Sequence, residues 1–198
     1  GYIARGRAKH VLVVAAEQMS RVLDWSDRGT CVLFGDGAGA AVVGAEGENP
    51  LAVKLSTNPD VATLHVPGIA GSSPYKATEG QDSTLVMDGR RVFKFGVNAI
   101  CDTVRELADD ARISVDEIDH FVFHQANERI LSQAVKRLDL PDERVVRTLH
   151  ETGNISSACI PFALDRLASS GELGAGDLIA LVGFGAGLDI GGYLLRWK

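Results

Sequence analysis

The sequence predicts an α/β fold in which helices cover a mixed β-sheet. Short apolar runs of strand length alternate with amphipathic stretches of helical period along most of the 198 residues. The chain also closes on two neighbouring apolar runs, residues 178–182 and 191–196, which flank a glycine-rich corner. Hydrophobic residues make up 45% of the sequence, which is enough for a buried core.

Strand-like runs dominate the first quarter of the chain. We expect residues 1–9 to end a helix and residues 10–17 to form a strand covered on both faces, because the second run is almost continuously apolar. Residues 57–81 are polar, aperiodic and dotted with Pro and Gly, which predicts a long, functional loop. Between these segments we expect a turn at 27–29 and short strands at 30–34, 38–44 and 51–56.

Amphipathic helices dominate the rest. The clearest has an apolar stripe spaced by four and three residues: Phe93, Val97, Ile100, Val104, Leu107 and Ala111. Ser114 and Glu117 fit a capping box. Asn127 can cap a second helix that carries Ile130 to Leu138, and Gly171 fits the C-terminal glycine of a third. Further expected elements are strands at 120–123 and 145–149, a turn at 150–154 and a helix at 156–170.

Composition and charge exclude several classes of protein. A net charge of −6 argues against general nucleic-acid binding. The longest apolar run, residues 178–184, is too short to cross a bilayer, and the first residues show no signal-peptide pattern. The three cysteines form neither a disulfide framework nor a zinc-binding pair. We therefore expect a cytoplasmic, reduced protein without a metal site.

Two polar residues stand where ligands bind in α/β sheets. His124 follows an expected strand, and Asn154 follows a strand and a turn, so both lie near the carboxyl edge of the sheet. Each alone also fits a structural histidine or a helix cap. The glycine segment 35–40 reads as a structural turn, because a strand rather than a helix follows it. Residues 183–187 could present backbone N–H groups to an oxyanion.

The cysteines and the basic clusters have ordinary structural interpretations. Cys31, Cys101 and Cys159 lie inside expected strands or helices, where they are small buried hydrophobes rather than nucleophiles. No Gly-x-Ser-x-Gly elbow is present. Two basic groups are read as solvated surface: Arg90, Arg91 and Lys94 in one helix, and Arg129, Lys136 and Arg137 in another.

Four ordered motifs together resemble the β-ketoacyl-acyl carrier protein synthase III family of the thiolase superfamily. They are Asp-Arg-Gly-Thr at 27–30 with Phe-Gly-Asp-Gly-Ala-Gly-Ala at 34–40, Met-Asp-Gly at 87–89 with Val-Phe-Lys at 92–94, His-Gln-Ala-Asn at 124–127 with Arg129 and Ile130, and Gly-Asn at 153–154 with Ser156, Ser157, Ala158 and Pro161. Each motif is weak by itself, whereas their order and spacing match the family across essentially the whole chain.

The resemblance implies a thiolase-like fold of two similar halves, each a mixed five-stranded sheet layered with helices. Residues 1–48 would be the end of the N-terminal half, and residues 49–198 the complete C-terminal half. The rest of the first half would lie outside this chain.

The resemblance also implies a decarboxylative condensation of acyl-CoA with malonyl-acyl carrier protein in fatty acid biosynthesis. Of the family's Cys, His and Asn, His124 and Asn154 match the last two; their N–H groups would stabilise the enolate oxygen left by CO2. Ala186 would donate its backbone N–H to the acyl oxyanion. The nucleophilic cysteine would lie outside this chain, so the chain alone should not form an acyl-enzyme and is expected to be inactive as a synthase.

Binding residues follow from the same resemblance. Arg28 matches a position near the CoA adenine, and Lys94 and Arg129 match contacts to the acidic carrier protein. Gly89, Phe93 and Asn127 would line the pantetheine tunnel. No cofactor is implied, because the CoA thioester and the carrier phosphopantetheine are substrates. The expected assembly is a homodimer, or a pair with a chain that supplies the N-terminal half.

One departure from the family pattern concerns the last glycine corner. It continues as Leu188-Asp189-Ile190-Gly191 instead of a Thr-Trp-Gly-like run, which leaves the starter acyl group open. Two other functions remain open at this point. One is a non-catalytic partner subunit of a complete synthase, and the other is a related acyltransferase of secondary metabolism.

Overall fold

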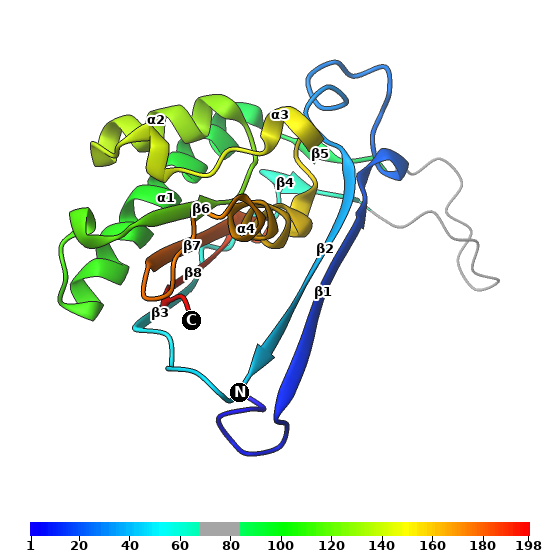
Figure 1. Ribbon diagram of the computed structural model, residues 1–198. Helices are drawn as coiled ribbons and strands as arrows, with labels where there is room; N and C mark the ends of the chain where they lie inside the picture. The colour runs from blue at the N-terminus through cyan, green and yellow to red at the C-terminus, as the bar shows by residue number, and fades with distance from the viewer. Residues whose placement is uncertain (68–83) are drawn as a thin grey trace.

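In the computed structural model, which describes residues 1–67 and 84–198, the chain forms a helix-covered mixed sheet beside a two-stranded ribbon (Figure 1). The main sheet has the strand order β3-β8-β7-β6, in which β6 and β7 are parallel and the other neighbours are antiparallel. Its strands are β3 (Ala52–Thr57), β6 (His120–Phe123), β7 (Leu178–Gly185) and β8 (Asp189–Arg196).

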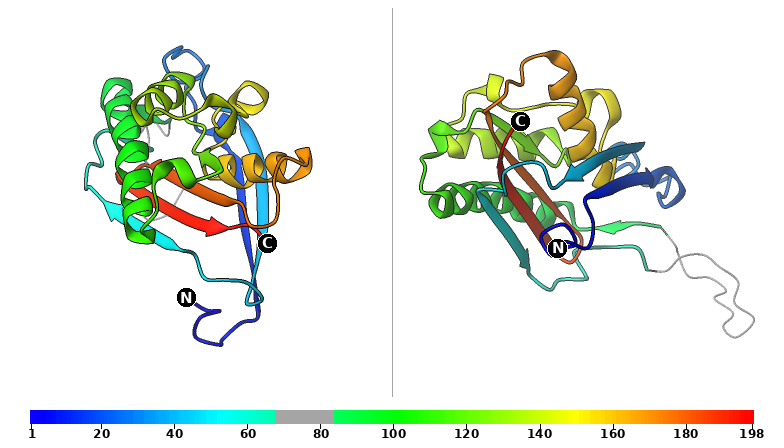
Figure 2. Two further views of the ribbon diagram at one scale, coloured as in Figure 1. Left: turned by 60° about the vertical axis from the view of Figure 1, so that its left-hand side comes forward. Right: turned by 60° about the horizontal axis from the view of Figure 1, so that its bottom comes forward.

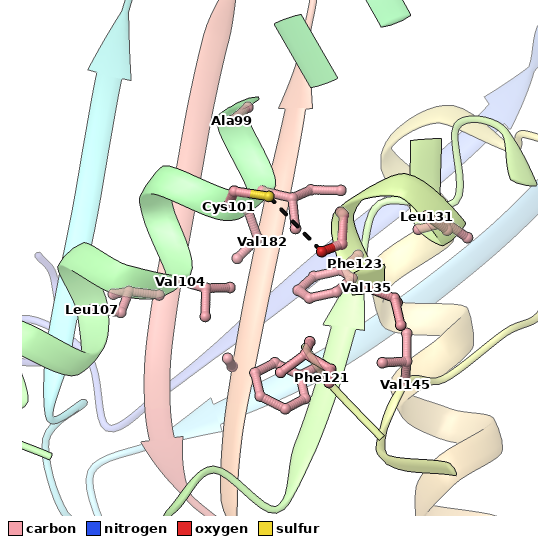
Figure 3. Close-up of a cluster of buried hydrophobic side chains, with 14 of the residues drawn as sticks. Ala99, Cys101, Val104, Leu107, Phe121, Phe123, Leu131, Val135, Val145 and Val182 are labelled. Atoms are coloured by element: carbon pink, nitrogen blue, oxygen red, sulfur yellow. Dashed lines mark hydrogen bonds between the residues drawn. The ribbon is translucent and has the colours of Figure 1, made fainter. Parts of the chain in front are cut away.

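Two helices cover one face of the main sheet. α1 (Gly89–Ala111) lies across β7, β8 and β3, and α2 (Glu128–Leu138) packs against α1. The predicted apolar stripe of α1 is real, since Val97, Ile100, Val104 and Leu107 are buried. These side chains meet Phe121, Phe123 and Val182 of the sheet in the largest core cluster (Figure 3).

The opposite face of the sheet packs against α4 (Cys159–Ser170). Alternation along β6 explains the division, because Phe121 and Phe123 point into the α1 side while Val122 joins Ala163 and Leu167 of α4. The ribbon of β1 (His10–Gln18) and β2 (Asp36–Gly44) runs beside α4 on this side (Figures 1 and 2). The layers are thus helices, sheet, helix and ribbon.

Several predicted local features are confirmed by the structure. The Ser114 N–H donates to Glu117 Oε2 at 2.7 Å, which closes the capping box. Asn127 Oδ1 accepts from Arg129 N at 2.8 Å as the cap of α2. Gly171 ends α4 in the left-handed conformation that favours glycine.

Other expected elements are corrected. Residues 1–9 form turns instead of a helix, and 30–34 form turns with one bridge, Phe34 to Asn154. The expected strand at 145–149 is reduced to a bridge between Val145 and Phe121, so the main sheet has, among residues 1–67 and 84–198, four named strands instead of five. This segment then turns into α3 (Leu149–Thr152), and a 3-10 turn at Ser156–Ala158 precedes α4. In the segments 30–34 and 145–149 the backbone pairs at a single residue, so neither segment forms a continuous strand ladder.

Two residues of the expected long loop form a short strand. β4 (Leu64–His65) pairs with β5 (Val86–Met87), and both precede α1 beside the site described next. The remaining predicted loop residues, 68–81, lie outside the described part of the chain. Within that described part, no helix is both long and apolar enough to span a membrane.

Candidate active site

A cavity of about 1290 Å³ opens where β6, β7 and α1 converge. Its walls come from segments that are distant in the sequence: the turns before β2, the β4–β5 pair, the first turns of α1 and α2, and the corner between β7 and β8. His124, Asn154 and Ala186 all line it. The fold therefore brings together the three residues that the resemblance assigns to chemistry.

His124 stands directly after β6. Its backbone N–H donates to Val182 O at 2.8 Å, which continues the parallel pairing by one residue and fixes the start of the side chain. The ring lies edge-on to the Phe184 ring, with centroids 5.2 Å apart. Although one part of the ring faces the cavity, burial lowers the pKa of His124 to about 4. The imidazole is therefore neutral near pH 7, with one N–H to donate.

Asn154 is held by backbone and side-chain contacts. Its N–H donates to Leu33 O at 2.8 Å, and its carbonyl accepts from Gly35 N at 3.0 Å. A Cβ on Gly35 would lie 2.0 Å from Thr152 O, so only glycine permits this approach. The Asn154 Oδ1 accepts from Ser156 N at 2.9 Å, and the residue is only 6% exposed. Asn154 can thus offer its NH2 group to the cavity it lines.

The corner between β7 and β8 supplies backbone groups. Gly185, Ala186 and Leu188 line the cavity, and Leu188 exchanges two hydrogen bonds of 2.8 Å with the backbone of Asn58. These two bonds to Asn58, which follows β3, hold the β7–β8 corner in addition to the hydrogen bonds between β7 and β8. The altered residue Leu188 is 5% exposed and contributes an apolar side chain to the wall.

The predicted binding residues separate into two groups. Gly89, Phe93, Asn127 and Arg129 line the cavity together with the chemical residues. Arg28 and Lys94 are exposed and do not belong to its lining. Phe93 is 37% exposed, which places it at an open part of the wall.

Sequence reasoning missed several cavity residues. Phe184 packs against both His124 and Phe95, whose ring centroid is 6.0 Å away. Its only signal was its position inside the glycine corner. Met19 and His65 also line the cavity, and no periodic pattern distinguished them.

None of the three cysteines lines the cavity. Cys101 is buried in the main core, with its thiol 3.9 Å from Ala134 O (Figure 3). Cys159 is buried behind Asn154, and burial raises the pKa of its thiol to about 11. Cys31 is half-buried. The expectation of small buried hydrophobes therefore holds for two of them. Across residues 1–67 and 84–198, no three His, Cys, Asp or Glu side chains form a group that could hold a metal ion.

Comparisons with known proteins point to one family. Residues 1–59 match the model of 3-oxoacyl-[acyl-carrier-protein] synthase III, and residues 108–197 match the model of its C-terminal part. The β-ketoacyl-[acyl-carrier-protein] synthase III of Oceanobacillus iheyensis is 42% identical over 198 residues, and that of Sinorhizobium medicae is 43% identical over 200. These alignments cover 99% of this chain but 60% and 61% of the two relatives.

Solved structures agree with the sequence matches. The synthase III of Pseudomonas aeruginosa PAO1 superposes with a TM-score of 0.89 at 38% identity, over 100% of this chain and 61% of that one. The enzyme of Thermus thermophilus gives 0.89 at 40% identity, over 100% and 62%. The expected thiolase-like α/β fold is confirmed. The chain spans about 60% of the length of the relatives it matches.

Proposed function

Because the chain belongs to the 3-oxoacyl-[acyl-carrier-protein] synthase III family, we propose that its cavity carries the decarboxylation and carbon–carbon bond formation of a malonyl thioester condensation. One observation carries the proposal. A neutral histidine and a restrained asparagine line the same cavity, beside a glycine corner. Two uncharged donors suit a reaction that generates a negative oxygen and must not protonate the new carbanion.

In this mechanism the bond between the malonyl α-carbon and its carboxylate breaks and CO2 leaves. The electron pair passes into the thioester as an enolate, whose oxygen accepts hydrogen bonds from the His124 imidazole and the Asn154 NH2. The α-carbon then attacks the carbonyl carbon of an acyl thioester. The resulting oxyanion accepts from the Ala186 N–H, collapses, and expels the acyl thiol as a thiolate.

The thiol that carries the acyl group is proposed to come from a polypeptide segment outside these 198 residues. The location of the three cysteines supports this view, since none faces the cavity and the Cys159 thiol stays protonated. Condensation would then require a second polypeptide or segment, whereas decarboxylation requires only the malonyl thioester and the two donors. The reaction balances without a metal or an organic cofactor.

Substrate recognition is proposed to follow the long thioester arm. Gly89, Phe93 and Asn127 line the cavity at the starts of α1 and α2, where a pantetheine chain could pass. Arg129 is exposed and lines the cavity, and the exposed Lys94 follows the lining residue Phe93 along α1. Both cations would suit an acidic carrier protein. Arg28, which precedes the cavity residue Gly29, is assigned to the CoA end.

The test is loss of CO2 from malonyl-acyl carrier protein in the presence of the chain. We expect Asn154→Ala to lower the rate by roughly 10²–10³-fold, the value of one oxyanion donor, and His124→Ala to lower it comparably. His150→Ala and Asn49→Ala are matched controls, because both residues are exposed and neither lines the cavity. Unchanged rates in both site variants would overturn the assignment.

A non-catalytic partner subunit is the second candidate. It is favoured by the wide apolar surface of the β1–β2 ribbon, where Leu12, Val14 and Val42 are each more than 60% exposed. For this function, the chain would bind a complete synthase in sedimentation experiments while releasing no CO2 by itself. A single soluble monomer that binds no synthase would exclude it.

The metabolic setting is a narrower question. A priming β-ketosynthase from a polyketide pathway is 39% identical to this chain, with a TM-score of 0.87. This similarity supports a second possible role for the chain, as an acyltransferase of secondary metabolism instead of an enzyme of fatty acid biosynthesis. Transfer of acyl groups to nucleophiles other than carrier proteins would identify it.

A further inference from the structure

The Gln125 side chain is a fully buried polar group next to His124 that the proposed chemistry does not use. Its Nε2 donates to Phe123 O at 2.9 Å and to Val146 O at 3.1 Å. Its Oε1 accepts from Thr148 N at 3.0 Å and from Leu149 N at 3.3 Å. Two donors and two acceptor sites are the full capacity of a carboxamide, so every one is used.

These four bonds join two separate segments of the chain. One is the end of β6, which presents His124, and the other is residues 146–149, which lead through α3 to Asn154. Burying an unpaired carboxamide would be costly, whereas a satisfied one ties both backbones in a single arrangement. The separation between the His124 and Asn154 segments therefore depends on this side chain.

A second contact continues from Gln125 to Asn154. The Cys159 Sγ lies 3.8 Å from Gln125 O and 3.7 Å from Asn154 Oδ1, both within hydrogen-bond range for sulfur. The Asn154 Oδ1 also accepts from the Ser156 N–H. The Ser156 N–H donates to this oxygen, whereas the single Cys159 thiol proton can donate either to it or to Gln125 O. A flipped amide would turn its NH2 against the Ser156 N–H. The present orientation is thus the one that leaves the NH2 for the cavity.

We propose that Gln125 and Cys159 are positioning residues, which hold the Asn154 carboxamide as a hydrogen-bond donor toward the cavity lined by His124. Gln125 sets the backbone separation, and the Cys159 thiol supplies a second donor to the amide oxygen beside the Ser156 N–H. The inference rests on the proposed function for its catalytic meaning, but the orientation itself is a property of the folded chain.

The first experiment compares Cys159→Ala with Cys159→Ser. Alanine removes the donor to Asn154 Oδ1, whereas serine keeps one. We expect the alanine variant to lower kcat for decarboxylation by roughly 10-fold or more, with KM for malonyl-acyl carrier protein changed less than about twofold, because misplaced groups lose rate steeply. Serine should restore most of kcat. Equal kcat in all three proteins would overturn the role of the thiol.

A matched control separates positioning from general packing. Cys101 is equally buried, but its thiol lies 3.9 Å from Ala134 O within the main core cluster and Cys101 does not line the cavity, so Cys101→Ala creates a similar void away from the site. Selective ¹⁵N labelling of asparagine side chains provides a readout that does not need activity. The Asn154 NH2 signals should shift in Cys159→Ala and not in Cys101→Ala.

Gln125→Glu tests the other half of the proposal. Glutamate keeps acceptors for Thr148 N and Leu149 N, but it loses both donors to Phe123 O and Val146 O when ionised and keeps only one of them when protonated. We expect the Asn154 NH2 and His124 ring signals to move together. If Gln125→Glu does not fold, the Cys159 series still decides. Unmoved Asn154 signals in both series would overturn the inference even if the chain decarboxylates; moved signals in a chain without activity would support the inference and refute the proposed function.

Discussion

His124 makes the stability of the folded chain depend on pH. Its pKa is about 4 in the folded protein and about 6.5 in the unfolded chain, so the unfolded state binds more protons between these values. The free energy of unfolding contributed by His124 is therefore complete above pH 6.5 and decreases as the pH falls toward 4. A shift of this size corresponds to at most about 3 kcal/mol of the free energy of unfolding, and exposure of part of the ring to the cavity reduces that value.

Urea unfolding at pH 7.0 and pH 4.5 measures this effect. Because carboxyl groups titrate over the same range, the informative quantity is the difference between the wild-type protein and His124→Gln at each pH. We expect the wild-type chain to lose more stability on acidification than the variant. Equal losses would show that the imidazole titrates normally in the folded state.

At the residue scale, the sequence pointed to His124 and Asn154 because each follows an expected strand, although neither was distinctive alone. The four-motif resemblance selected them, and the cavity contains both. Gln125 and Cys159 were not identified as positioning residues, because their role depends on segments more than 20 residues apart that meet only in the fold. Arg28 and Lys94 were assigned by resemblance and stay predictions, since their partners are other molecules.

Helix α1 transmits packing to the site through Gly96. A Cβ at this position would lie 2.7 Å from two ring carbons of Phe184, the residue that packs edge-on to His124. Alanine would gain about 1 kcal/mol of helix propensity, but overpacking typically costs about 1–3 kcal/mol. We expect Gly96→Ala to lower the free energy of unfolding and to shift the His124 ring signals.

Gly89→Ala is the matched change in the same helix, because nothing lies within 4 Å of its added Cβ. We expect this variant to keep the wild-type His124 spectrum and to be at least as stable in urea. If both alanine variants behave alike, the contact between Gly96 and Phe184 does not couple α1 to the site.

At the scale of elements, periodicity and capping residues predicted α1, α2 and α4 well. The stripe from Phe93 to Ala111 and the Asn127 cap depend on neighbours within one helix, so the local sequence determines them. The strand predictions for residues 30–34 and 145–149 were wrong because strands, unlike helices, are not determined by neighbours in the sequence. Strand pairing depends on distant partners, and each segment found only one bridge.

The whole molecule departs from the sequence prediction at its ribbon. The apolar run of β1 predicted a strand covered on both faces, and one face does pack toward Ile155 and Phe162. The other face is bare, although it carries the cross-strand pair Leu12 and Val42 with Val14 beside it. Within residues 1–67 and 84–198, β1 and β2 pair only with each other. The division at residues 48 and 49 remains a prediction of the resemblance.

This bare face predicts self-association of the chain. Leu12 is 65% exposed and Val42 69%, and burying such apolar area is favourable by about 25 cal/mol per Å². We expect the wild-type chain to sediment as a species larger than its 21.0 kDa monomer at micromolar concentration.

The double variant Leu12→Glu, Val42→Glu should sediment as a monomer, because the two paired carboxylates would repel each other and resist burial. Its His124 spectrum should be unchanged, since neither residue lines the cavity. The exposed pair Leu55→Glu, Val61→Glu outside the ribbon controls for added charge. A wild-type monomer, or a control variant that dissociates as fully, would show that the ribbon does not drive association.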